Sequence, residues 1–148
     1  MNNKKVKVLM IIGSLGDGGK ERQLLLLLKT FKQNENIITT LISMNAGGER
    51  ENEARQFADY FEVLPGKRGL IFLTPLGKLM KLIKQQDINL IHTWGSGIWD
   101  FLGVIAGRLS RIPVIHNGIR SAPKHLNIFN RITRVGALMA DVTVANSY

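Results

Sequence analysis

The sequence has 148 residues, of which 45% are hydrophobic and 21% charged, and this fits one globular domain with a substantial core. It contains no cysteine, which excludes a disulfide framework and a thiolate metal site. The formal net charge is +9, from 20 Lys and Arg against 11 Asp and Glu. This charge favours anionic partners but does not choose among nucleic acid, anionic lipid and sugar nucleotide.

The amino terminus carries basic residues followed by the apolar run Val6–Ile12, which superficially resembles a signal peptide. Lys7 interrupts this run, and a glycine-rich turn follows it in place of a cleavage pattern, so a first β-strand explains it better. The longest uninterrupted apolar stretch, Leu24–Leu28, is far short of the roughly 20 residues that span a bilayer. We expect a cytoplasmic protein, either soluble or peripheral at the inner face of the membrane.

Short apolar runs alternate with segments of helical period along the chain. The predicted strands are Val6–Ile12, Ile37–Ile42, Tyr60–Leu64, Ile88–Thr93, Val114–His116 and Val142–Ala145. The predicted helices are Lys20–Lys32, Glu51–Ala58, Leu76–Gln86, Gly97–Ser110 and Leu126–Met139. Because the strands are almost continuously apolar, we expect an α/β fold with a doubly wound, mostly parallel Rossmann-like sheet and helices on both faces.

Local signals refine this pattern. Thr74 and Pro75 suit an N-cap and the first position of a helix, and Pro113 suits the start of a strand. Gly103 and Gly107 lie on one helical face, where they would let the helix pack closely on the sheet. The sequence stops directly after the last predicted strand, where a further helix is expected, so we expect the polypeptide to be part of a longer one.

A glycine-rich segment, Gly13–Gly19, follows the first predicted strand. In doubly wound folds ligands lie beyond the carboxyl ends of the strands, and glycines with free N–H groups at a helix start favour a phosphate or another anion. The alternative is a flexible turn without a ligand. The segment matches neither the dinucleotide fingerprint, because its glycine spacing differs and Asn45 stands near the expected carboxylate, nor a P-loop, because Glu21 follows Gly19-Lys20.

Three blocks of sequence, in order, resemble glycosyltransferase family four. The first is KVLMIIGSLGDGGKERQLLLLL, with a Gly-Gly-x-Glu-Arg turn before a Leu-rich helix; the second is INLIHTWGSGIWDFLGVIAGRLSRIPVIHNGIRS; and the third is ADVTVANS. Together they span nearly the whole chain and resemble the amino-terminal half of a GT-B glycosyltransferase.

The resemblance implies two Rossmann-like domains that face each other across a cleft. Residues 1–148 correspond to the first, acceptor-side domain, and the donor-binding carboxyl-terminal domain is absent from this sequence. The family retains anomeric configuration, usually without a metal ion, so we expect no metal and no cofactor besides the nucleotide-sugar co-substrate. Gly18 and Gly19 would place backbone N–H groups near the donor diphosphate, and Gly16 would shape the same turn.

The resemblance leaves the other candidate site residues with alternatives. Either His116 or Arg120 matches the family position that contacts the transferred sugar, although a strand histidine is commonly structural and Arg120 could be a surface residue. Trp94, Gly95 and Ser96 follow the fourth strand at the expected cleft edge. Trp94 either stacks on a sugar ring or closes the core at the end of the sheet, and we slightly favour packing in the core. Glu21 and Arg22 are expected to serve the helix dipole and solvent. No pair of carboxylates stands out as an acid/base couple.

Basic residues also indicate a surface for anionic membranes. Lys78, Lys81 and Lys84 recur at three-residue intervals on a predicted helix, and Lys67 and Arg68 precede an apolar run nearby. Basic residues beside exposed apolar ones bind anionic interfaces. The commoner alternative is a solvated basic face over a buried apolar stripe.

The leading hypothesis is the acceptor-side half of a retaining glycosyltransferase, inactive as this fragment, with a nucleotide-sugar donor and a glycan or lipid-linked acceptor. Such an enzyme would serve cell-surface polysaccharide or glycolipid synthesis. The alternative is a non-catalytic acceptor-binding or membrane-anchoring subunit of a split, two-chain glycosyltransferase. Nucleic-acid binding would rest on basicity alone, since no recognition motif accompanies the charge.

Overall fold

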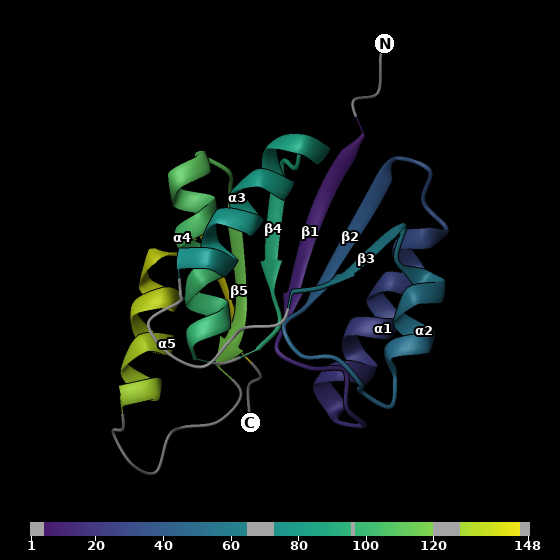
Figure 1. Ribbon diagram of the computed structural model, residues 1–148, viewed down its shortest axis with the longest axis horizontal. Helices are drawn as coiled ribbons and strands as arrows, with labels where there is room; N and C mark the ends of the chain where they lie inside the picture. The colour runs from purple at the N-terminus through teal and green to yellow at the C-terminus, as the bar shows by residue number, and fades with distance from the viewer. Residues whose placement is uncertain (1–4, 65–72, 96, 120–127, 146–148) are drawn as a thin grey trace.

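The fold is a six-stranded parallel sheet in the order β3-β2-β1-β4-β5-β6, seen in a computed structural model that describes residues 5–64, 73–95, 97–119 and 128–145 (Figure 1). The strands are β1 Val6–Ile12, β2 Ile37–Ser43, β3 Tyr60–Val63, β4 Leu90–Thr93, β5 Val114–Ile119 and β6 Val142–Ala145. Every pair of neighbouring strands runs parallel. The Rossmann-like α/β fold predicted from the alternation is therefore confirmed.

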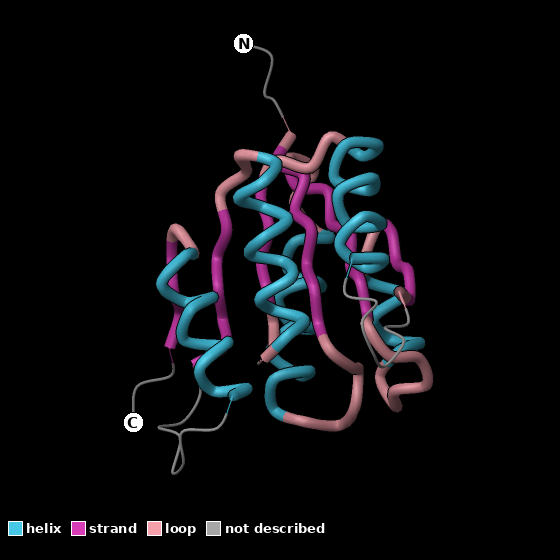
Figure 2. The backbone as a smooth tube through the Cα atoms, turned by 60° about the vertical axis from the view of Figure 1, so that its left-hand side comes forward, coloured by secondary structure: helices cyan, strands magenta, loops and turns pink. Residues whose placement is uncertain are grey.

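Helices cover both faces of this sheet. They are α1 Gly19–Lys32, α2 Glu51–Phe57, α3 Leu73–Gln86, α4 Ile98–Ser110 and α5 Ile128–Met139. Helices α1 and α2 lie on one face and α3, α4 and α5 on the other (Figures 1 and 2). The chain moves outward from β1 to β3, returns to β4 beside β1, and then moves outward in the opposite direction. Right-handed crossovers put the helices of the two halves on opposite faces.

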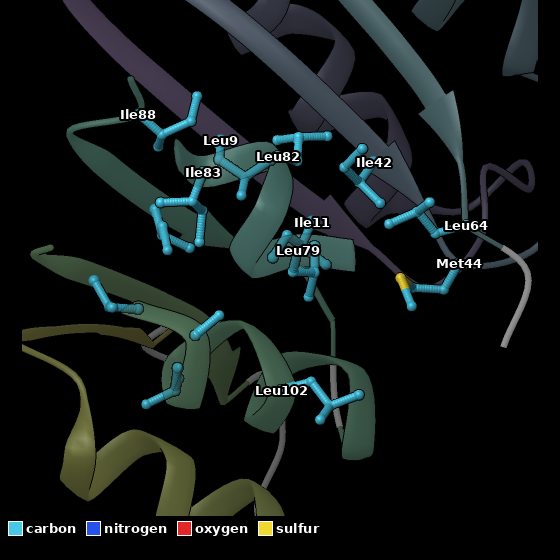
Figure 3. Close-up of a cluster of buried hydrophobic side chains, with 14 residues drawn as sticks. Leu9, Ile11, Ile42, Met44, Leu64, Leu79, Leu82, Ile83, Ile88 and Leu102 are labelled. Atoms are coloured by element: carbon cyan, nitrogen blue, oxygen red, sulfur yellow. The ribbon is translucent and has the colours of Figure 1, made fainter. Parts of the chain in front are cut away.

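Strand β1 supplies the centre of both hydrophobic cores because successive side chains of a strand point to opposite faces. Val8, Met10 and Ile12 pack with the buried leucines of α1, whereas Leu9 and Ile11 pack with α3 and α4. All five are at most 2% exposed. Figure 3 shows the second cluster, in which the labelled leucines of α3 point toward β1.

Helix α4 lies close to the sheet because two of its residues have no side chain on that side. A Cβ atom at Gly107 would lie 2.2 Å from Cγ2 of Val114, and one at Gly103 would lie 2.7 Å from Cγ2 of Thr93. Both glycines are buried. The predicted close packing of this helix on the sheet is confirmed.

Among the described residues, three predicted boundaries were wrong by two residues or more. Strand β4 starts at Leu90 because the N–H of Ile88 instead bonds the Ile83 carbonyl at 3.0 Å. Strand β5 continues past His116 to Ile119, with an irregularity in its register to β6 where Gly118 lies. Helix α3 begins at Leu73, so Thr74 lies inside the helix and is not its N-cap. Pro75 is the third residue of the helix, where a proline is tolerated because the N–H groups of the first turn have no intrahelical partner.

The packing of Gly107 yields a prediction about stability. Gly107→Ala should lower the free energy of unfolding by about 1–3 kcal/mol, because the new methyl group overlaps Val114. The matched control is Gly77→Ala on α3, where nothing lies within 4 Å of the new Cβ, and this change should stabilise the helix by up to about 1 kcal/mol. Urea denaturation measures both, and equal effects would contradict the packing argument.

Candidate functional site

The chain reverses its direction of travel across the sheet between β1 and β4, which creates a switch point at the carboxyl edge of the sheet. In open α/β sheets this is where ligands bind. Helices α1 and α4 both start at this edge, on opposite faces. Their N-caps are Gly18 and Gly97, and neither makes a side-chain capping hydrogen bond. The glycine-rich loop after β1 and the loop after β4 are therefore brought together, as the strand order requires.

The β2–α2 loop braces the glycine-rich loop. Leu15 is fully buried, and its carbonyl accepts a hydrogen bond from the Arg50 N–H at 2.9 Å. A Cβ at Gly48 would lie 2.3 Å from the same carbonyl oxygen, so only glycine allows this approach. The Asn45 side-chain amide donates to the Gly13 carbonyl at 2.6 Å. Two backbone carbonyls of the glycine-rich segment, those of Gly13 and Leu15, are thus bonded to the β2–α2 loop.

An ion-pair network closes the outer side of this loop. Two guanidinium groups converge on the Asp17 carboxylate, Arg22 at 3.1 Å and Arg50 at 2.5 Å. Hydrogen bonds from Arg50 and then Arg22 hold the pKa of Asp17 below its ordinary value. Since the Asp17 side chain is 46% exposed, solvent screens these pairs, and their main effect is to orient the loop.

The expectation that Glu21 faces solvent was wrong. Glu21 is 6% exposed and occupies the third position of α1, with its carboxylate packed against Gly18. Its ammonium partner is Lys20 at 3.4 Å. A carboxylate at a helix N-terminus is stabilised by the helix dipole, so the dipole part of the expectation is consistent with this position. Burial follows because the side chain folds back beneath the N-cap.

Helix α4 repeats this arrangement. Asp100, also at the third helical position, is 1% exposed, and its Oδ1 would lie 3.0 Å from a Cβ at Gly95. Both helices that start at the switch point therefore carry a buried acidic residue under a glycine. The sequence signal was present in both cases as an acidic residue three positions after an N-cap glycine.

Gly16 and Gly19 differ from these packed glycines. A Cβ at either position would have no heavy atom within 4 Å, and neither residue has a positive φ. The fold therefore accepts a side chain at both places. Of the two glycines predicted to face the diphosphate, Gly18 is in close contact with the protein itself, through Glu21, and Gly19 is not.

His116, a candidate for contact with the sugar, lies within β5 and is fully buried. Its Nδ1 lies 3.0 Å from Oγ1 of Thr93, and its Nε2 has no hydrogen-bond partner in the described part of the chain. Burial lowers the pKa of His116. Burial thus favours the neutral imidazole and closes Nε2 off from solvent. Arg120, the other candidate, lies outside the described residues.

Trp94 is 5% exposed and packs with the α1-side cluster, so the packing alternative is confirmed. Its ring lies 4.8 Å from that of His92, centroid to centroid. Burial lowers the pKa of His92 to about 4. Gly95 is buried beside Asp100, and Ser96 lies outside the described residues.

Of the five basic residues predicted to form a membrane surface, three lie among the described residues and two do not. Lys78, Lys81 and Lys84 are exposed on α3, whereas Lys67 and Arg68 lie outside the described residues. In the described ranges no helix has the length and hydropathy to cross a bilayer. Nor do three His, Cys, Asp or Glu side chains gather as a metal site in those ranges.

Solved structures that share this fold include GT-B nucleotide-sugar enzymes. HepE from Anabaena, in complex with UDP and glucose, gives a TM-score of 0.74 at 21% identity over 96% of this chain and 38% of its own. MurG from Acinetobacter baumannii gives a TM-score of 0.71 at 19% identity, over 97% of this chain and 41% of its own. UDP-GlcNAc 2-epimerase from Methanocaldococcus jannaschii gives a TM-score of 0.72 at 14% identity, over 96% of this chain and 40% of its own.

These similarities show the fold, and the chain spans about 40% of the length of these solved structures. No protein-family model matches the sequence, and no curated protein matches it either. The fold class is thus shown, while the GT-B architecture of the whole protein and membership of family four stay predictions.

The partly buried His92 and the fully buried His116 predict how stability depends on pH. Because the folded pKa of His92 is about 4 and the unfolded value is about 6.5, the unfolded chain binds more protons between these values. The free energy of unfolding should therefore be fully present above about pH 6.5 and fall as the pH drops toward 4. His116 contributes in the same direction.

His92→Gln should reduce this slope, since glutamine does not titrate. Urea denaturation at several pH values between 7 and 4 measures it for both proteins. Lys29→Gln, an exposed change on α1, is the control and should leave the slope unchanged. Identical slopes for wild type and His92→Gln would show that this side chain is not buried as described.

Proposed function

We propose that this chain is the acceptor-side half of a retaining glycosyltransferase of the GT-B fold, which transfers a sugar from a nucleotide-sugar donor to a glycan or lipid-linked acceptor. The donor would be held mainly by a second Rossmann-like domain. The proposal is supported by the shared fold, since the neighbours include the glycosyltransferase MurG and a protein in complex with UDP and glucose. The sequence blocks around the glycine-rich loop support family four within that fold.

The observation that carries the proposal is the open space at Gly16 and Gly19 on the carboxyl edge of the switch point. Neither glycine is required by packing or by a positive φ, so the space beside both is free for a ligand. A diphosphate fits this position because the first N–H groups of α1 have no intrahelical acceptor and the helix dipole favours negative charge.

Nearby charges suit the same ligand. Lys20 on the first turn of α1 has a side chain that is 26% exposed and is held by Glu21. As the glycosidic bond to the donor breaks, negative charge grows on the leaving diphosphate, and fixed N–H groups with a nearby ammonium stabilise it. Because His116 is fully buried, Arg120 is the better candidate for direct contact with a ligand.

Transfer assays on the protein expressed from its complete reading frame test this function. A panel of UDP-, GDP- and ADP-sugars should identify one donor whose nucleotide is released faster when acceptor is present. Conversion of a UDP-sugar to its 2-epimer without transfer would instead support the chemistry of the epimerase neighbours. A reading frame that ends without a second domain would favour the alternative, an acceptor-binding or membrane-anchoring subunit of a split enzyme.

Gly19→Ala separates the ligand role of the loop from its structural role. The new methyl group meets no protein atom, so the free energy of unfolding should stay equal or rise by up to about 1 kcal/mol. In the complete protein, kcat/KM for the donor should fall at least about tenfold, because the methyl group occupies the space proposed for the diphosphate. Gly77→Ala is the control for a neutral glycine change, and unchanged kcat/KM in Gly19→Ala would refute the proposed position of the donor.

A further inference from the structure

A cavity of about 290 Å³ lies on the α3 face of the sheet, at its amino edge. Lys7, one of its lining residues, is the second residue of β1, whereas the glycine-rich loop follows the last residue of that strand. The six-residue step from Lys7 to Gly13 along the extended chain corresponds to about 20 Å. The cavity is therefore distinct from the switch point, and it is also remote from β6, which lies at the other end of the strand order.

The register of the sheet builds the floor of this cavity. Lys7 on β1 is paired with Ile38 on β2, and Thr40, two residues further on, is paired with Tyr60 on β3. Because alternate residues of a strand point to one face and paired residues share that face, all four side chains lie on the α3 face. Phe61, the next residue of β3, packs into the α1-side cluster, and Tyr60 on the opposite face is left 57% exposed.

The carboxyl end of α3 forms one wall of the cavity. The hydroxyl of Thr40, which is 2% exposed, donates a hydrogen bond to Oε1 of Gln86, the last residue of α3. This bond holds the carboxamide in place, and its two N–H groups make no hydrogen bond with a described residue. Gln85 beside it is exposed, and Ile38 and Ile88 add apolar surface. The cavity thus offers hydrogen-bonding groups next to apolar ones.

The charges around the cavity nearly balance. Among the described residues that line it, Lys7 is the only charged one, and its Nζ lies 3.5 Å from Oδ2 of Asp87, which follows α3. The carboxyl end of a helix also disfavours an anion, because the helix dipole is negative there. The electrostatics of the cavity therefore favour a neutral ligand.

We propose that this cavity binds one neutral sugar unit of a glycan. A sugar hydroxyl both donates and accepts hydrogen bonds, and the carboxamides of Gln85 and Gln86 and the hydroxyl of Tyr60 do both as well. The C–H groups on one face of a pyranose ring are apolar, and they suit the exposed ring of Tyr60. The cavity combines polar and apolar groups in the way that a sugar does.

The size and the lining of the cavity argue against other occupants. Sites for small molecules have volumes of roughly 300–1,000 Å³, and this cavity lies at the lower end of that range, which fits a single sugar and not a nucleotide-sugar. A lipid chain or an apolar peptide segment would bury the carboxamide groups without partners, which is unfavourable. Sugar binding here does not rest on the proposed function, because it requires no transfer.

Saturation-transfer-difference NMR with the protein expressed from its complete reading frame tests the proposal. The probes are the methyl glycosides of glucose, galactose, mannose and N-acetylglucosamine, with methyl glucuronide and inorganic phosphate as anionic comparisons. At least one neutral glycoside should bind, and neither anion should bind more tightly than it does. Absence of binding by all the neutral glycosides, or tighter binding of either anion, would overturn the proposal.

Variants locate the bound glycoside. Tyr60→Ala and Gln85→Ala should each weaken its binding about three- to tenfold, because an aromatic contact or a hydrogen bond is lost. The matched controls, Leu26→Ala on α1 and Gln56→Ala on α2, change exposed residues away from the cavity and should leave the Kd unchanged, as should Gly19→Ala at the switch point. Thermal unfolding of each variant confirms that it folds. Loss of binding in Gly19→Ala, or equal losses in the cavity and control variants, would overturn the proposal; failure of the transfer assays with intact glycoside binding would not.

Discussion

Burial of β1 on both faces is the constraint on which the rest of the structure depends. Its alternating side chains enter two separate cores, so α1 must cover one face while α3 and α4 cover the other. The strand order then places β4 beside β1 and leaves the loops after these two strands at the same edge. The candidate site is thus a consequence of how the central strand is buried.

The glycine-rich loop combines hydrogen-bonded backbone carbonyls with open space beside two of its glycines. Leu15 anchors the loop in the core, and Asn45 and Arg50 bind its backbone carbonyls from the β2–α2 loop. This bracing leaves Gly16 and Gly19 without close neighbours. A preorganised loop avoids the entropy of ordering when it binds a ligand, which is what phosphate recognition by backbone N–H groups requires.

Periodicity predicted the strands, the helices and their covering of both faces, because burial imposes a local pattern on each element. Contacts between distant segments leave no such pattern. Asn45 and Arg50 lie some thirty residues from the loop that they brace, and the sequence offers no reason to pair them. The burial of Glu21 was missed for another reason, since an acidic residue in a first helical turn satisfies the dipole equally well in solvent.

Several cations of α3 and α5 make no ion pair with any described residue. Lysines three residues apart on α3 repel one another, and the arginines of α5 do so too, whereas Arg55 on α2 is paired with Glu51 one turn away. Leu138 is likewise left in water at 85% exposure. None of these features stabilises the isolated chain. Exposed aliphatic side chains also occur on the edge strand β6, at Val142 and Val144, so the apolar area at this end of the sheet is left for a partner outside the described residues to cover.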